Sequence, residues 1–379
     1  MPKLARPWMR LITVALICSS IVIEWLFLTG APLSGRALAD AFTGTRAKAP
    51  APVVYLRPTF QTGVTFPRWG QNSYTPGDPN YAIGLGEIQQ QTASHWVELT
   101  IFLTQPYNTS TTVSADPLSA TPDSLATGIE AAHAHGFKVF VEPLLSLEHP
   151  VGSGIRWSGD VDFGNDRAAT ADWFQSYWQA LQPYLLAAQR AGADQFAIGA
   201  ELDRLEADAP ASDWNWLIEQ ARSVYTGSLT YDLNFTSLVA PVRSWMLSPL
   251  LNALGVSMYM SIVPSATERV DLNSIPERWA QTAGAELDAF ARLANRPIVI
   301  SEIGYRNSTD AGFNPFSDTT TAGPDPQLQA ALYSAAASYA LTDPHIIGLY
   351  FWAWSLPPFS PNWSPAAQTL KRWYTSPLA

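Results

Sequence analysis

The chain has 379 residues, of which 47% are hydrophobic and only 14% are charged, and this composition excludes an intrinsically disordered protein. It carries 22 basic and 32 acidic residues, and the resulting formal charge of −10 argues against a nucleic-acid partner. Cys18 is the only cysteine and there are five histidines, so a thiolate or histidine-rich metal centre is not expected. We expect neither a metal nor another cofactor.

The first 39 residues have the pattern of a targeting segment. Three basic residues precede an apolar stretch over residues 11–30, and Ala37-Leu38-Ala39 offers small residues before a cleavage point. We expect a signal peptide over residues 1–39, with an uncleaved membrane anchor as the alternative, because the apolar stretch is nearly long enough to span a bilayer. The protein would then be secreted or extracytoplasmic. Residues 40–59 are expected to form a linker, and residues 60–379 the folded domain.

Eight apolar segments in the rest of the chain are predicted strands. Several are continuous apolar runs, such as Ile298-Val299-Ile300, which are typical of parallel strands buried on both faces. The predicted strands cover residues 63–69, 96–103, 138–145, 195–202, 229–235, 255–261, 297–305 and 346–354.

Helical patterns lie between these strands. They cover residues 124–135, 168–191, 214–224, 279–294 and 327–341. Gly136, Gly192 and Gly227 follow three of them and are expected to cap the helix ends. Eight strands that alternate with helices predict an α/β fold, a (β/α)8 TIM barrel that forms a single catalytic domain. An open doubly wound sheet is the alternative, although residues 66–69 provide no glycine-rich phosphate loop after the first strand.

Two glutamates stand where predicted strands end. Glu201 closes the fourth strand and Glu302 the seventh, and the carboxyl ends of barrel strands are where active sites form. Either residue alone could be a helix cap or a member of an ion pair. Together they are what glycoside hydrolysis requires, because one carboxyl group protonates the leaving oxygen while the other attacks or activates water. Mutual repulsion would raise the pKa of one of them and keep it protonated as the acid.

In the order of its segments, the chain resembles glycoside hydrolase family 113, the β-mannanase-related barrels of the retaining clan A, over residues 63–354. The segments that carry the resemblance are residues 63–66, 120–125, 157–160, 198–202, 229–231, 255–259, 301–305 and 350–354. The resemblance implies that Glu201 is the acid/base and Glu302 the nucleophile. It also implies that Tyr259 holds the nucleophile and that Trp352 forms the floor of the sugar site.

Two departures from the family pattern concern the specificity for mannan. Ala200 stands where most of the clan has an asparagine that reaches the sugar 2-hydroxyl. The third strand, at residues 141–145, lacks the polar residue that mannanase-like relatives often carry there. Neither departure removes the two carboxyl groups.

Other residues at strand ends or in the loops after them are candidate sugar ligands. They are Trp69, Glu142, Trp157, Asn234 and Tyr305. Glu142 could instead form a salt bridge with Arg68, Asn234 could satisfy backbone groups, and each tryptophan could belong to the core.

These residues predict a secreted retaining glycoside hydrolase that cleaves β-glycosidic bonds of a polysaccharide or oligosaccharide, with mannan as the favoured substrate. The mechanism would be a double displacement by two glutamates. A catalytically silent barrel that only binds glycans is the alternative, and the presence of both carboxyl groups disfavours it. A metal-dependent barrel hydrolase is disfavoured by the few histidines. We expect a monomer that contacts a membrane only through an N-terminal anchor.

Overall fold

The structure is a computed structural model that describes residues 57–151 and 155–376. The chain divides into two units, residues 1–53 and 54–379, and all described residues belong to the second. The expected signal peptide and nearly all of the expected linker therefore lie outside the described residues. Among the helices of the described part, none has both the length and the apolarity that a membrane span requires.

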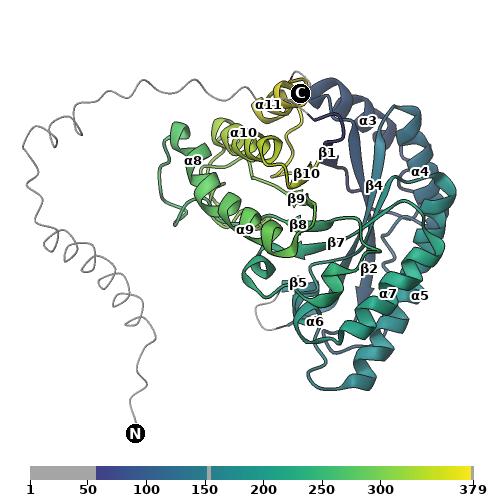
Figure 1. The fold of residues 1–379 in the computed structure, drawn as a ribbon. Helices are drawn as coiled ribbons and strands as arrows, with labels where there is room; N and C mark the ends of the chain where they lie inside the picture. Colours follow the sequence, from purple (N-terminus) through teal and green to yellow (C-terminus); the bar gives the residue numbers. More distant parts are fainter. Residues whose placement is uncertain (1–56, 152–154, 377–379) are drawn as a thin grey trace, which may run out of the picture. The chain divides into compact units, whose positions relative to one another are not determined.

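Eight parallel strands form a closed barrel with helices around it (Figure 1). They are β1 (Gln61–Thr65), β2 (Trp96–Gln105), β4 (Lys138–Val151), β6 (Gln195–Ala200), β7 (Ser228–Asn234), β8 (Leu254–Ser257), β9 (Ile298–Ile303) and β10 (Ile346–Phe351). Each strand pairs with the next, and β10 pairs with β1, so the sheet has no free edge. The predicted barrel is confirmed, and the open doubly wound sheet is excluded.

Two short strands extend the barrel wall by antiparallel pairing. β3 (Ser114–Ala115) pairs with β2, and β5 (Ile155–Trp157) pairs with β4. The ladder between β2 and β4 runs from Trp96–Lys138 to Gln105–Leu147, far longer than the other barrel ladders. This wall therefore rises above the carboxyl ends of the other strands.

The five predicted helical segments are all present in the structure, together with others that were not predicted. The α-helices are α3 (Pro79–Thr92), α4 (Pro122–Ala134), α5 (Arg167–Ala191), α6 (Asp203–Asp208), α7 (Ala211–Val224), α8 (Ile275–Trp279), α9 (Ala285–Ala294), α10 (Pro326–Thr342) and α11 (Pro365–Tyr374). The segment predicted as one helix over residues 279–294 is interrupted, because a π-helical turn at Ala280–Gly284 joins α8 to α9. The Tyr339 hydroxyl donates to the Gly284 carbonyl at 2.7 Å in this turn.

Two of the three predicted glycine caps are confirmed. Gly192 caps α5 with a φ of 76°, and Gly136 follows α4 with a φ of 85°, both in the left-handed region that favours glycine. The prediction for Gly227 is wrong, because α7 ends at Val224 and Tyr225 is its cap. A Cβ at Gly227 would lie 2.4 Å from the Tyr225 hydroxyl, so this glycine makes room for a side chain instead.

The inside of the barrel changes from apolar to polar along the strands. Trp96, Phe140 and Val299 belong to an apolar cluster near the strand beginnings. Because alternate residues face inward, the next inward positions on these strands are Glu98, Glu142 and Ser301. They belong to a buried polar layer whose members are each at most 1% exposed: Thr65, Glu98, Glu142, Asp232, Ser257 and Ser301. Three carboxyl groups thus lie below the carboxyl ends of the strands.

Candidate active site

Glu201 follows β6 directly and has its side chain fixed at both oxygens. Its φ of 51° is left-handed, which is uncommon for a residue other than glycine and frequently occurs at functional sites. The Trp157 indole N–H donates to Glu201 Oε2 at 2.8 Å, and the Asn234 amide donates to Oε1 at 2.8 Å. The structure therefore brings two predicted sugar ligands to the predicted acid/base.

The two donors reach Glu201 from opposite sides of β6. The pairing of Trp157 with Ser146 places the indole on the wall formed by β4 and β5. Asn234 is the last residue of β7, and its Oδ1 accepts from the Thr236 N–H at 2.9 Å. That bond orients the amide so that its nitrogen faces Glu201.

Glu302 lies in β9, and its side chain contacts Tyr259, which follows the neighbouring strand β8. The Tyr259 hydroxyl donates to Glu302 Oε1 at 2.5 Å, and the Met258 N–H donates to the Glu302 carbonyl at 2.7 Å. Tyr259 follows the end of β8 and is buried. The contact that the family resemblance implies for Tyr259 is present.

Both glutamates face one cavity of about 200 Å³ at the carboxyl end of the barrel. Its lining consists of Leu144, Leu145, Arg156, Trp157, Ser158, Ala200, Glu201, Glu302 and Trp352. Trp352 follows β10 and forms part of the cavity wall, as the family resemblance implies. Ala200, the residue before Glu201, also contributes to the cavity lining.

Loss of solvent raises the pKa of both glutamates. The pKa of Glu302 lies well above its usual range, and the negative charge of Glu201 raises it further. The hydrogen bond from Tyr259 opposes this shift. The pKa of Glu201 is also raised by burial, while the bonds from Trp157 and Asn234 lower it. Ionisation of either group therefore disfavours ionisation of the other.

The family of the chain follows from its sequence. The model of Glycoside Hydrolase Family 113 matches residues 74–369. The chain belongs to glycoside hydrolase family 113. It is therefore a glycosidase, and the fold and the two facing carboxyl groups suit that chemistry. No protein of curated function matches the sequence.

Solved structures with the same fold include members of family 113. A complex structure of a GH113 β-1,4-mannanase has a TM-score of 0.69 and 20% identity, and the match covers 84% of this chain and 99% of that one. The GH113 β-mannanase AaManA from Alicyclobacillus acidocaldarius, in complex with ManMIm, has a TM-score of 0.69 and 22% identity, covering 83% and 97%. A β-glucuronidase from Ruminococcus gnavus has a TM-score of 0.54 and 12% identity, covering 84% and 50%. At these identities the similarity concerns the fold.

Apart from Asn234, which contacts Glu201, three predicted sugar ligands of this family 113 enzyme lie outside the cavity lining. Trp69 is 47% exposed and stacks on Phe102 at 5.2 Å. Glu142 is fully buried and cannot touch a sugar in this structure, so its prediction as a ligand is corrected. Tyr305 is buried as well, and its hydroxyl accepts from the Trp279 indole at 2.8 Å, so it belongs to the packing between β9 and α8.

The proposed salt bridge between Glu142 and Arg68 is absent. Arg68 pairs with Asp78 through two bonds of 2.6 and 2.7 Å. Four lining residues were not predicted: Leu144, Leu145, Arg156 and Ser158. Leucines at strand positions carry no signal that separates a cavity wall from a core. Arg156 and Ser158 depend on β5, a strand too short to be recognised by its periodicity.

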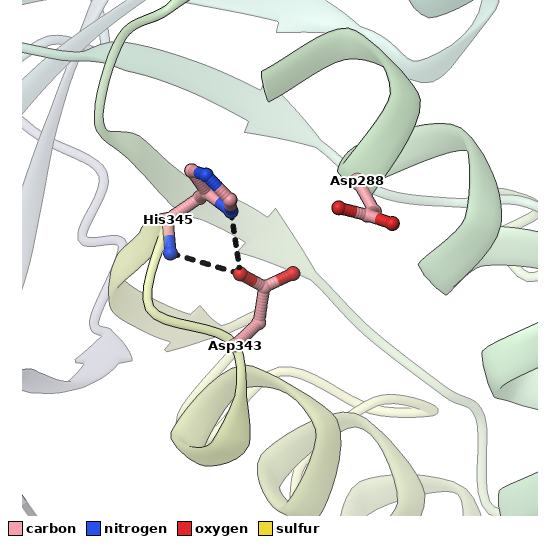
Figure 2. Close-up of side chains that lie close together, drawn as sticks. All are labelled: Asp288, Asp343 and His345. Atoms are coloured by element: carbon pink, nitrogen blue, oxygen red, sulfur yellow. Dashed lines mark hydrogen bonds and ion pairs between the residues drawn. The ribbon is translucent and has the colours of Figure 1, made fainter. Parts of the chain in front are cut away.

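One cluster of the described residues has the spacing of metal ligands. Asp288 of α9, Asp343 after α10 and His345 before β10 have candidate ligand atoms within 4.8 Å of one another (Figure 2). His345 is hydrogen-bonded to Asp343 at 3.1 Å, and Asp288 is paired with Arg292 at 2.5 Å. The group lies at the amino end of β10, away from the glutamate cavity, and its partly exposed side chains already have partners.

We expect Tyr259→Phe to lower kcat/KM by about 10–100-fold, because it removes a hydrogen bond to a charged group. The bond lowers the pKa of Glu302, so its loss should also move the acid limb of the pH–rate profile to higher pH. The measurement is kcat/KM against pH. Tyr305→Phe, which removes a buried hydroxyl outside the cavity, is the control. An unmoved acid limb in Tyr259→Phe would show that the bond does not tune Glu302.

Proposed function

We propose that this glycosidase cleaves β-mannan with retention of configuration, with Glu201 as acid/base and Glu302 as nucleophile. The observation that carries the proposal is the geometry of the two glutamates. They lie at the ends of β6 and β9 on one cavity, and each is held by donors that orient its carboxyl group. The two family 113 structures described as β-mannanases support mannan as the substrate.

In the first step the Glu302 carboxylate attacks the anomeric carbon and the glycosidic C–O bond breaks. Glu201 gives its proton to the departing oxygen, so the leaving sugar is a neutral alcohol. The negative charge has then moved from Glu302, which is now esterified, to Glu201. The Trp157 and Asn234 donors stabilise Glu201 in this charged form.

In the second step a water molecule replaces the departed sugar. Glu201 takes a proton from the water, the water oxygen bonds to the anomeric carbon, and the ester bond to Glu302 breaks. Both carboxyl groups return to their starting states. Two inversions at one carbon give net retention.

A release assay on purified full-length enzyme tests this function. Reducing sugar is measured over mannan, galactan, xylan and β-glucan, and NMR follows the anomer formed first. We expect release from mannan and the β anomer first. Release from a different glycan alone would contradict mannan as the substrate, but it would still support glycosidic hydrolysis. The α anomer first would contradict retention, and glycan binding without release would indicate a silent barrel.

We also propose that residues 1–39 direct export and that the enzyme acts outside the cytoplasm as a monomer. The support for export is the basic, apolar and small-residue pattern of the segment. Cell fractionation and N-terminal sequencing of the mature protein test this. A start at Asp40 supports a signal peptide, and an intact membrane-bound chain supports the anchor. An intact chain in the cytoplasm would contradict export, and a larger particle in light scattering would contradict the monomer.

A further inference from the structure

Two carboxyl groups of the buried polar layer lie on neighbouring strands. Glu98 of β2 and Glu142 of β4 are both 0% exposed. In the register of the two strands, Glu98 is opposite Phe140 and Glu142 is opposite Thr100, so the two glutamates are diagonal neighbours on the inner face. The two carboxyl groups lie within hydrogen-bonding reach of each other.

The carboxyl groups of Glu98 and Glu142 can bond to each other only if one of them is protonated. The Thr65 hydroxyl donates to Glu98 Oε2 at 2.6 Å. In the described part of the chain, no donor forms a hydrogen bond with Glu98 Oε1 or with either oxygen of Glu142. None of the ion pairs formed by the described residues includes Glu98, Glu142 or Asp232. Ionised carboxylates only accept hydrogen bonds, so two of them in contact in a buried place need a proton between them.

We propose that Glu98 and Glu142 hold at least one proton between them throughout the working pH range of the enzyme, with Glu142 as the donor and Glu98 as the acceptor. This proton keeps a further negative charge from forming below the catalytic cavity. The shared proton itself is independent of the proposed function, and only its effect on catalysis rests on that function.

The surroundings of the pair favour this state. The titratable groups that face it are Asp232 of β7, Glu302 of β9, Tyr350 of β10 and Tyr177 of α5, and none of them is basic. Burial raises the pKa of Glu98 to about 7 and that of Glu142 well above its usual range, and Glu98 and Asp232 raise the latter further. Asp232 accepts from Ser257 at 2.7 Å and from Ser301, so neither serine is available to the pair.

The pair matters for the nucleophile because charge on Glu98 raises the pKa of Glu302. A second charge, on Glu142, would lie in the same layer and oppose ionisation of Glu302 in the same way. Glu142 is therefore not part of the catalytic machinery: its proton keeps a charge out of the layer below Glu302, and it does not touch the substrate.

The test uses the full-length protein with Glu142→Gln, which keeps the size of the side chain and supplies a permanent N–H donor. Glu148→Gln, an exposed glutamate at the end of the same strand, is the matched control. Infrared difference spectra at about pH 8, where an ordinary glutamate is ionised, should show a carboxylic-acid C=O band that Glu142→Gln lacks and Glu148→Gln retains. Absence of that band from the wild-type spectrum would overturn the proposal.

Thermal unfolding gives a second readout that does not depend on activity. A carboxyl group whose pKa is raised by folding stabilises the protein below about pH 4, and this stability is lost as pH rises toward the folded-state pKa. The Tm of Glu142→Gln should therefore exceed that of the wild type by an amount that grows with pH, reaching roughly 2–4 °C near about pH 8. A Tm difference that is constant with pH would contradict the shared proton. So would a wild-type Tm that rises with Na⁺ or K⁺ at fixed pH and ionic strength, because the pair would then hold a cation.

The pH–rate profile tests the catalytic consequence. Glu142→Gln replaces one neutral group with another, so kcat/KM should stay within about threefold of wild type and the acid limb should not move. A shift of the acid limb to lower pH would mean that Glu142 had carried a charge, and would overturn the proposal. If no glycan is hydrolysed, the infrared and thermal readouts still decide whether the proton is shared.

Discussion

Glu302→Ala is expected to lower kcat/KM by at least ~10⁴-fold on every glycoside, including those with good leaving groups. Without the carboxylate no covalent intermediate forms, and the Tyr259 hydroxyl loses its acceptor at 2.5 Å. Protonation by Glu201 cannot compensate, because the anomeric carbon has no group to attack it on the opposite face. The measurement is kcat/KM on the hydrolysed polysaccharide and on an aryl glycoside.

Two controls separate the loss of the nucleophile from the loss of the fold. Glu302→Gln keeps the volume of the side chain and should be equally inactive, while Glu148→Ala on the exposed end of β4 should be active. Because folding raises the pKa of Glu302, its neutral replacement by glutamine should raise the Tm at neutral pH relative to wild type. Azide added to Glu302→Ala should give a glycosyl azide of inverted configuration. Substantial turnover of natural glycans by both Glu302 variants would contradict the assignment.

The barrel could be predicted because its strands are buried on both faces. A segment such as Ile346–Phe351 cannot alternate between apolar and polar, and its continuous apolar run is visible in the sequence. Helices α3 and α11 were missed for local reasons. Helix α3 contains Gly84 and Gly86, which are weak helix formers, and α11 spans only ten residues. Tertiary packing stabilises both helices, and this contribution cannot be predicted from the sequence of a single segment.

The two cavity glutamates could be predicted because each stands where an apolar run ends at the carboxyl end of its strand. Glu142 has the same local pattern, yet it lies below the cavity. The reason is that β4 continues to Val151, whereas an end near Leu145 was predicted. The longer strand places Leu144 at the cavity and Glu142 one inward position deeper. The length of β4 depends on its ladders with β2 and β5, which are long-range pairings.

The partners of Glu201 show a further limit of prediction from sequence. Trp157 and Asn234 were predicted to bind sugar, and the structure turns both toward the carboxyl group of Glu201. A strand pattern indicates that a side chain lies near the site, but the rotamer and the hairpin formed by β4 and β5 decide which group it contacts. Their contacts with Glu201 alter its pKa, and the behaviour of Glu201 variants depends on them.

Glu201→Ala is expected to lose at least ~10²-fold in kcat/KM on natural glycans, the scale of one acid–base group. Substrates with a phenolate leaving group need little protonation, so attack by Glu302 should survive and the glycosyl-enzyme should accumulate. Water then lacks a base, and turnover should be slow. Azide, which needs no deprotonation, should restore turnover and give a glycosyl azide of retained configuration.

The pH dependence provides an internal check on the same assignment. Glu201 must hold a proton for the first step, so wild-type activity falls as pH rises through its pKa, which burial raises. For Glu201→Ala acting on aryl glycosides, the rate of the glycosylation step should therefore no longer fall at alkaline pH. The Trp157 bond lowers the pKa of Glu201, so Trp157→Phe should move the limb to higher pH. If Glu201→Ala kept the wild-type rate on natural glycans, or if azide gave only the inverted product, Glu201 could not be the acid/base.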